Sequence, residues 1–120
     1  MSFIHRELAS GKWRELSFLE QMGKIGSEID RTIKWKLQQK PDLSSKAFER
    51  VLELVDLTIQ DPKNLKRLRE LCRVREALVD YFIYDNQYES NDDLWHQYFY
   101  VFAYAAQNRK HLQGFENKPS

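Results

Sequence analysis

The stretch of sequence that decides the fold is residues 13–39, WRELSFLEQMGKIGSEIDRTIKWKLQQ. Its apolar residues recur at intervals of three and four positions, the spacing that places side chains on one face of an α-helix. Alternation of apolar and polar residues, which indicates a β-strand, is scarce throughout the chain. Gly23 and Gly26 cost a helix roughly 1 kcal/mol each relative to alanine, so they indicate close approach of a neighbouring helix. The stretch predicts a long helix with an inward stripe of Phe18, Leu19, Met22, Ile25, Gly26, Ile29, Ile33 and Leu37.

Prolines with neighbouring polar caps predict where the next two helices begin. Lys40-Pro41 ends the first helix, because a proline disfavours helical geometry in the residue before it. Either Asp42 or Ser44 is expected to cap the second helix by accepting hydrogen bonds from free backbone N–H groups. Asp61-Pro62 marks the start of the third helix, since proline lacks only an N–H group that would have no partner at that position.

The fourth helix is expected to begin at the cap Ser90-Asn91-Asp92-Asp93, whose acids suit the positive end of the helix dipole, and to end near His111. Four amphipathic helices joined by short loops pack as an antiparallel up-down-up-down four-helix bundle. A length of 120 residues suits a single domain with a single core. We therefore predict one all-α domain over residues 1–120, with a short helical turn near Ser2–Ala9 in an N-terminal segment (1–12) and a flexible tail over 112–120.

Composition and charge narrow the class of protein. Hydrophobic residues make up 42% of the chain and charged residues 31%, a globular balance, and 19 basic residues against 18 acidic ones create no overall field for a polyanion. A single cysteine, Cys72, cannot form an internal disulfide, which fits a reducing compartment. The longest apolar run, YFYVFAYAA at 98–106, is shorter than the roughly twenty residues that span a membrane, and residues 1–25 lack a signal-peptide pattern. We expect a soluble cytoplasmic protein with no membrane contact.

Residues 94–106, LWHQYFYVFAYAA, contain six of the sixteen aromatic residues in the chain. On a helical wheel most of these rings share an arc that is expected to face the core, whereas Tyr100 and Tyr104 lie on the opposite side. Trp35 and Leu57 also fall outside the expected core faces. Single exposed aromatic residues are common, but tyrosine is also enriched at protein interfaces. We predict that these four residues form an interface through which the protein contacts a second copy or another protein.

Residues 63–75, KNLKRLRELCRVR, contain six basic residues against one acidic residue. A helical wheel places a basic face on the third helix, made of Lys63, Lys66, Arg67, Arg69 and Arg73. Such a face is able to neutralise the phosphates of a nucleic acid. The same pattern is also typical of an ordinary solvated helix face, because Glu76 and Asp80 continue this face with the opposite charge. Contact with nucleic acid is therefore the alternative interpretation.

Arg75 falls near the centre of the apolar arc of the third helix. A buried arginine needs an acceptor, because an unpaired charge in the core is strongly destabilising. Asp30, at the edge of the first helix's stripe, is the expected partner, and Tyr98 is available as a ring or hydroxyl partner. We predict a buried pair of Arg75 and Asp30 that fixes the register of the helices; an anion site in a cleft is the alternative.

Patterns that indicate catalysis or metal binding are scarce. A di-iron bundle uses two Glu-x-x-His motifs, whereas this chain has one Asp93-x-x-His96. It contains no glycine-rich phosphate loop and no nucleophile elbow, and Cys72 is expected to be a small core residue. We predict a non-enzymatic protein without a cofactor, metal or small-molecule substrate, which acts as a self-associating interaction or scaffold protein or, alternatively, as a nucleic-acid-binding accessory protein.

Overall fold

The computed structural model describes the backbone of residues 11–116 and the side chains of residues 11–109. Four α-helices and two 3-10 helices account for most of this part of the chain, and it contains no strand. In chain order the elements are η1 (Lys12–Glu15), α2 (Phe18–Leu37), α3 (Pro41–Gln60), η2 (Pro62–Arg67), α4 (Leu68–Phe82) and α5 (Asp92–Glu116). The prediction of an all-α fold is confirmed. The helical turn expected near Ser2–Ala9 lies outside the described residues.

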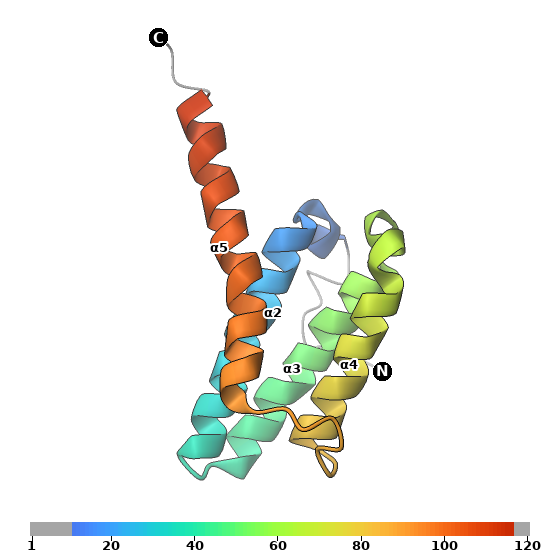
Figure 1. Cartoon of the computed structure of the whole chain (residues 1–120), viewed down its shortest axis with the longest axis vertical. Helices are drawn as coiled ribbons and strands as arrows, with labels where there is room; N and C mark the ends of the chain where they lie inside the picture. The colour runs from blue at the N-terminus through green and yellow to red at the C-terminus, as the bar shows by residue number, and fades with distance from the viewer. Residues whose placement is uncertain (1–10, 117–120) are drawn as a thin grey trace.

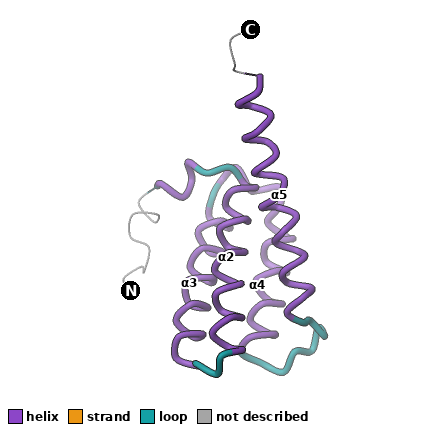
Figure 2. The backbone as a smooth tube through the Cα atoms, turned by 90° about the vertical axis from the view of Figure 1, so that its left-hand side faces the viewer, coloured by secondary structure: helices purple, strands orange, loops and turns teal. Residues whose placement is uncertain are grey.

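The four α-helices run alternately up and down and lie side by side (Figure 1). The most extensive backbone contacts join α2 to α3 and α2 to α5, and α3 also contacts α4. Figure 2 shows that α5 continues past the ends of the other helices, which accounts for the longest dimension of a molecule measuring 55 × 31 × 26 Å. The predicted up-down-up-down four-helix bundle is present, and α5 is its one long projecting member among the described elements.

The first long helix begins at Phe18 and not at Trp13, because a capping box precedes it. The hydroxyl of Ser17 accepts a hydrogen bond from the backbone N–H of Glu20 at 3.1 Å, and the Glu20 carboxylate accepts from the backbone N–H of Ser17 at 3.3 Å. The chain before this box forms η1, in which the buried indole of Trp13 donates to the hydroxyl of Thr58 on α3 at 2.9 Å. η1 therefore covers part of α3.

α3 begins at Pro41, and neither residue expected to cap it does so. Lys40 occupies the N-cap position without a side-chain hydrogen bond. The hydroxyl of Ser44 donates instead to the backbone carbonyl of Thr32 on α2, at 3.0 Å. Asp42 lies in the first turn, where its charge suits the helix dipole. The hairpin between α2 and α3 is thus tied by a bond between the two helices.

The start signal at Asp61-Pro62 is confirmed in position but is followed by a different type of helix. The Asp61 carboxylate accepts a hydrogen bond at 3.1 Å from the backbone N–H two residues later, as a cap does. The six residues that follow form the 3-10 helix η2, which completes a turn every three residues, and α4 begins only at Leu68. A wheel drawn from Pro62 with the α-helical period is therefore out of phase for α4. Leu65 and Leu68 are exposed, and so is Cys72, which the sequence predicts as a core residue.

α5 begins at the predicted cap and ends later than predicted. The side chain of Asn91 accepts a hydrogen bond from the backbone N–H of Leu94 at 2.8 Å. The helix continues to Glu116, whereas the sequence predicts an end near His111. Its last turns therefore pass beyond the end of the bundle (Figure 1).

A single hydrophobic cluster forms the core, with contributions from η1 and all four α-helices. Its buried members are Trp13, Met22, Ile25, Ile29, Phe48, Val51, Leu54, Val55, Leu57, Leu71, Val74, Leu78, Trp95 and Phe99. Leu37 of the predicted stripe is exposed, because it is the last residue of α2. Most of the stripe predicted on α2 is otherwise buried or half-buried, as its spacing requires.

Two glycines allow α5 to approach α2 closely. A Cβ atom on Gly26 would lie 2.6 Å from the Cβ atom of Phe99, which is closer than two carbon atoms can pack. Gly23 faces Ala103, and its Cβ atom would lie 3.4 Å from the Ala103 backbone. On the side of α5 toward α4 the distance is bridged by long side chains, since the Tyr98 hydroxyl donates to Glu70 at 2.9 Å. α5 therefore packs closely against α2 at the two glycines and contacts α4 through long side chains.

Candidate interaction surface

Large apolar side chains are exposed along the side of α5 that faces away from the bundle. Tyr100 and Tyr104 are 58% and 55% exposed, and Leu94 and Val101 are 51% and 62% exposed. These four side chains form the outer face of α5. Toward α2, by contrast, the aromatic side chains of the same helix are buried. α5 is therefore apolar on two opposite sides, and only one of them is covered within the described part of the molecule.

The rings on this surface are ordered by contact with one another. Tyr104 stacks on Tyr100 with a centroid distance of 6.1 Å and an interplanar angle of 27°, and Tyr100 stacks on His96 at 6.1 Å and 26°. His96 Nδ1 lies 3.3 Å from the carboxylate of Asp30, which fixes this end of the stack to α2. Rings that are already ordered lose less side-chain entropy when a partner covers them.

Shallow hollows run beside these rings, between α2 and α5. The larger one has a volume of about 290 Å³ and is lined by Glu20, Gly23, Lys24, Ser27, Ala103, Ala106 and Gln107. A smaller one of about 70 Å³ adjoins it and reaches Tyr100 and His96. Small residues face each other here, and the spacing of Gly23 and Ser27 on α2 with Ala103 and Ala106 on α5 is the sequence signal that would have located the hollow.

The other two residues predicted for the interface do not join Tyr100 and Tyr104. Leu57 is 8% exposed and belongs to the core, so its assignment to an interface is wrong. The physical reason is η1, whose Trp13 bonds to the residue that follows Leu57 and covers this part of α3. Trp35 is half-buried near the end of α2, where the ammonium groups of Lys34 and Lys40 lie 5.3 and 5.2 Å from its ring centre.

The predicted basic face divides into engaged and unengaged residues. Lys63 forms an ion pair with Asp61, and Arg67 pairs with Glu70 at 3.9 Å and lies over the ring of Phe18. The remaining members have exposed side chains and form no ion pair with any side chain of residues 11–109; they are Lys66, Arg69 and Arg73. These three form a narrower strip than the sequence suggests.

The carboxylate of Asp80, which the sequence places on the same face, has another role. It accepts hydrogen bonds from the backbone N–H groups of Gln87 and Tyr88, at 2.8 and 3.0 Å, and so shapes the loop between α4 and α5. The Asp80 carboxylate therefore bonds to the backbone of this loop and does not neutralise Lys66, Arg69 or Arg73.

The predicted buried pair of Arg75 and Asp30 is absent, and both residues have other partners. Arg75 Nε lies 2.7 Å from Asp56 on α3, and this pair is about two-fifths exposed. The hydrogen bond to Asp56 raises the pKa of Arg75. The buried residues of α4 are Leu71, Val74 and Leu78, so Arg75 lies at the edge of the buried face, where it meets Asp56 of α3. Tyr98 is not its partner either, because that hydroxyl bonds to Glu70.

A polar clamp holds the first turn of α5 against α2 and α4. The carboxylate of Asp92 accepts hydrogen bonds from Lys36 at 2.7 Å and from the Tyr81 hydroxyl at 2.5 Å. Burial opposes the charged forms of Asp92 and Lys36, but the mutual bonds outweigh it, so the pKa of Asp92 is lowered and that of Lys36 is raised. Burial and the bond to Asp92 raise the pKa of Tyr81. The shifts follow from contacts between helices.

A second polar cluster is fully buried at the opposite end of the bundle. The Gln21 amide donates to Asp61 at 2.9 Å and to the backbone carbonyl of Trp13 at 3.0 Å, and it accepts from Asn64 at 2.9 Å. Burial opposes ionisation of Asp61, but bonds from Lys63 and Gln21 lower its pKa overall. This cluster is not among the features predicted from the sequence, although Gln21 on the inward side of an apolar stripe is a signal for it. Its bonds join η1, α2 and η2.

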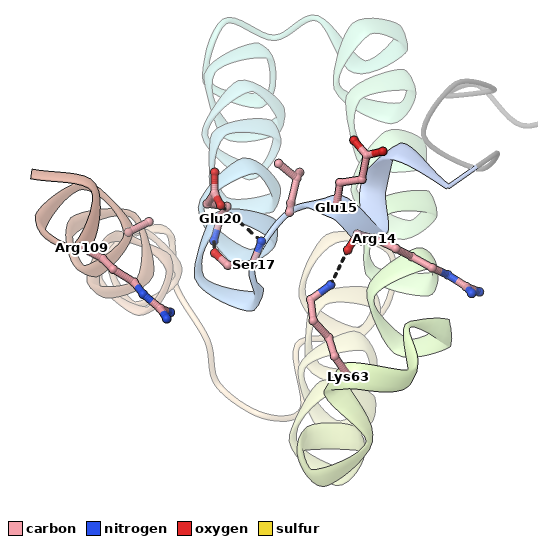
Figure 3. A pocket seen from close by; sticks show the side chains of 8 residues that line it. Arg14, Glu15, Ser17, Glu20, Lys63 and Arg109 are labelled. Carbon is pink, nitrogen blue, oxygen red and sulfur yellow. Dashed lines mark hydrogen bonds between the residues drawn. The ribbon is translucent and has the colours of Figure 1, made fainter. Parts of the chain in front are cut away.

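A charged pocket of about 360 Å³ lies beside this end, between η1, the start of α2 and α5 (Figure 3). It is lined by Arg14, Glu15, Leu16, Ser17, Glu20, Lys63, Ala106 and Arg109. Lys63 Nζ donates to the backbone carbonyl of Arg14 at 2.8 Å, while the guanidinium group of Arg14 points away from Lys63 and Arg109 (Figure 3). Cations and carboxylates are mixed and do not converge, so the pocket lacks the geometry of an anion site.

A wider hollow of about 550 Å³ lies at the other end, between α2, α3 and the end of α4. Its apolar floor includes Phe48, Leu52 and Phe82. Lys36 stands at its rim, but the ammonium group is already paired with Asp92. The hollow therefore offers an apolar surface and no unpaired cation among the residues that line it.

Within the part of the chain that the structure describes, no three histidine, cysteine, aspartate or glutamate side chains are grouped so as to hold a metal ion. None of the described helices combines the length and apolar character needed to cross a membrane. Comparison of the sequence and structure with protein-family models, curated proteins and solved structures finds no match.

Proposed function

We propose that this protein is a non-enzymatic interaction or scaffold protein that self-associates through the outer face of α5. The observation that supports this proposal most directly is the exposure of Tyr100, Val101 and Tyr104 on a helix whose opposite side is buried in the core. Contiguous apolar exposure of this kind on a soluble protein marks a surface that another molecule covers.

A second copy of the chain is the occupant that this surface suits best. Tyrosine combines an apolar ring with a polar hydroxyl, which suits a surface that must tolerate water before association. A two-fold pair brings identical patches together, so one stack of tyrosine rings supplies both halves of the interface.

We also propose a cytoplasmic location, because the single exposed thiol of Cys72 suits a reducing compartment.

The absence of an enzymatic role is supported by how the titratable groups are used. Groups whose pKa is shifted are candidates for catalysis when they converge in a cleft. Here Lys36, Tyr81 and Asp92 bridge three helices, Arg75 bridges to α3, and Asp61 lies in the cluster around Gln21. Tyr98, whose pKa is raised by burial and by its bond to Glu70, joins α5 to α4. Each group with a shifted pKa is thus engaged in a contact between structural elements.

Molar mass in solution, measured by light scattering over a range of concentrations, tests this proposal. We expect a dimer for the natural sequence and a monomer for Tyr100→Ser combined with Tyr104→Ser. The matched control is Tyr84→Ser combined with Tyr88→Ser, because these tyrosines are at least as exposed but lie in the loop after α4. A monomeric natural protein, or equal loss of dimer in the control, would refute self-association through α5.

The strip of Lys66, Arg69 and Arg73 favours a second candidate function, contact with nucleic acid. Three cations without an ion pair among the described residues lie along one side of η2 and α4 and could neutralise phosphates. Fluorescence anisotropy with labelled RNA and DNA duplexes and single strands tests it. Binding should weaken with rising salt and should be abolished by Arg69→Glu with Arg73→Glu, but should survive Lys24→Glu with Lys46→Glu. Equal effects of the two charge reversals would reject a site on this strip.

A further inference from the structure

Exposed leucines lie beside the unpaired cations at the start of α4. Leu65 and Leu68 are 72% and 38% exposed, and the small apolar side chain of Cys72 is exposed as well. The backbone N–H of Leu68 bonds to the carbonyl of Leu65, a 3-10 turn in which side chains three residues apart lie above one another. Cys72 follows Leu68 by four residues, which is one turn of α-helix. These three side chains form the apolar line of η2 and α4.

The strip of Lys66, Arg69 and Arg73 runs beside the apolar line. Each cation follows a member of that line by one residue, which places it a little more than a quarter turn around the helix. α4 stands at one edge of the bundle (Figure 1). One side of η2 and of the first turns of α4 therefore presents an apolar row and a positive row to solvent.

The carboxylates around this surface are engaged elsewhere or lie beyond its end. Asp56 pairs with Arg75 at 2.7 Å, and the carboxylate of Glu70 accepts the hydroxyl of Tyr98 at 2.9 Å. Glu76 follows the last member of the apolar line by one helical turn, so the line ends there with a negative charge. Over residues 65–73 the surface is thus both positive and apolar.

An anionic lipid surface suits both properties at once. Its headgroups attract cations, while leucine side chains enter the boundary between the headgroups and the acyl chains. The aliphatic stems of lysine and arginine lie along the apolar layer, and their charged ends reach the headgroups. The hollows described above are lined by other residues, and a fluid lipid surface needs no recess on the protein, whereas the anchors of a protein partner fill pockets.

A nucleic acid would use only half of this surface. Its phosphates pair with the cations, but proteins that hold single strands stack the bases on aromatic rings, which leucine lacks. Contact with phosphates alone would leave Leu65 and Leu68 in water. The exposed leucines therefore favour lipid over the nucleic acid that is the second candidate function of the same strip.

We propose that η2 and the first turns of α4 lie on an anionic membrane surface, with the two leucines among the headgroups and the strip of cations paired with lipid phosphates and carboxylates. Such attachment is peripheral and reversible, because it buries far less apolar surface than a membrane-spanning helix does. The expectation of no membrane contact rests on the length of the apolar runs, which concerns crossing a bilayer and not contact with its surface. Because this surface lies on η2 and α4, the proposal does not depend on self-association through α5.

Sedimentation with lipid vesicles tests the electrostatic part of the proposal. We expect the natural protein to bind vesicles of phosphatidylcholine containing about one-third phosphatidylserine, to dissociate at high salt, and to bind phosphatidylcholine alone weakly. Arg69→Glu with Arg73→Glu should lower the partition coefficient roughly thirtyfold or more, since each cation near such a surface contributes about fivefold. Lys24→Glu with Lys46→Glu changes the net charge equally at other exposed positions and should have little effect.

A matched pair of leucine variants tests insertion into the lipid. Leu65→Ser with Leu68→Ser should lower the partition coefficient roughly tenfold or more, because two apolar side chains no longer leave water. The control is Leu37→Ser with Leu43→Ser, since these leucines are 69% and 40% exposed and lie at the other end of α3. Equal binding by the two folded variants would overturn insertion of the leucines.

The only cysteine of the chain gives a direct measurement without altering the surface charges. A fluorophore whose emission shifts to the blue in apolar surroundings is attached to the exposed thiol of Cys72. We expect a blue shift when anionic vesicles are added and none with neutral vesicles. The same fluorophore at Ser45→Cys in a Cys72→Ser background, exposed near the start of α3, should not respond. An equal response at the two positions would overturn the proposed orientation.

Two further outcomes would overturn membrane contact through this surface. One is failure of the natural protein to bind anionic vesicles. The other is binding of RNA that is lost with Arg69→Glu and Arg73→Glu but retained with Leu65→Ser and Leu68→Ser, without binding of vesicles, which would assign the strip to nucleic acid. Light scattering without lipid tests self-association separately, so failure of that proposal is distinguishable from failure of this one.

Discussion

The two sides of α5 carry similar residues and meet different surroundings. Toward α2, Phe99 is buried against Gly26, and Trp95 lies in the same cluster. On the outer face, Tyr100 and Tyr104 have comparable rings and are more than half exposed. The difference arises from the neighbouring helix, because glycine on α2 allows one side of α5 to approach closely and no described element covers the other. An aromatic residue of α5 is therefore buried or left exposed according to which element faces it.

The largest expected effect is the difference in free energy of unfolding between alanine variants of Phe99 and Tyr100. Phe99→Ala should reduce the free energy of unfolding by about 3–5 kcal/mol, because it removes a buried ring and leaves a cavity. Tyr100→Ala should change it by less than about 0.5 kcal/mol when measured on the monomer, since the ring is exposed. Urea denaturation at low protein concentration, where dimer formation adds nothing, measures both. Similar losses in the two variants would contradict the division of α5 into a core side and an outer face.

A second test compares the two glycines that face α5. Gly26→Ala should destabilise the fold by about 1–3 kcal/mol, because the new methyl group would overlap Phe99 and force the helices apart. Gly23→Ala should be neutral or stabilising by up to about 1 kcal/mol, since its Cβ atom meets Ala103 at 3.4 Å and alanine favours the helix. Thermal unfolding of both variants measures the difference. Equal stabilisation by the two alanines would show that α2 and α5 are not closely packed at Gly26.

The residues that the sequence placed correctly are those governed by local rules. The stripe on α2 and the caps at Asp61 and Asn91 follow from helical spacing and from backbone N–H groups that need acceptors. The exposure of Tyr100 and Tyr104 follows from the helical wheel of α5 in the same way. Within one helix, therefore, both the fold and the candidate surface could be predicted.

The residues that the sequence misplaced depend on phase or on contacts between distant elements. The buried face of α4 is set by Leu71, Val74 and Leu78, which leaves Arg75 at its edge, bonded to Asp56 of α3. η1 lies against α3 through the bond of Trp13 to Thr58, the residue after Leu57, and no local pattern of the second helix reveals this contact. The hollow beside Tyr100 requires small residues of two helices to face each other. Packing between elements therefore set the limit of prediction.

A smaller effect is expected on the side of α5 toward α4. Tyr98→Phe should cost about 0.5–1.5 kcal/mol, because it removes the hydrogen bond to Glu70 and keeps the ring that fills the space between the helices. Tyr104→Phe is the matched control on the outer face and should leave the stability of the monomer unchanged, since its hydroxyl bonds to no described residue. Chemical denaturation of both variants checks the pair. A comparable loss in Tyr104→Phe would mean that the outer face contributes to the fold of the monomer.

The smallest expected effect compares two neighbouring aspartates at the start of α5. Asp92→Asn should cost about 0.2–1 kcal/mol, the range of partly exposed ion pairs, because it weakens the clamp with Lys36 and Tyr81. Asp93→Asn should have less effect on the monomer, since Asp93 has no ion pair among the described side chains.

The clamp formed by Asp92, Lys36 and Tyr81 also has a defined pH dependence. The pKa of Asp92 is lowered from 3.8 in the folded protein, so its stabilising contribution is present above that value and is lost as pH falls through the lower folded pKa. The difference in stability between the natural protein and Asp92→Asn should therefore be constant from about pH 5 to pH 9 and shrink below about pH 4. If the difference instead persisted at the lowest pH at which the protein folds, an ionised Asp92 could not be the source of the clamp, and the anchoring of α5 would have to be assigned to its packing against α2 alone.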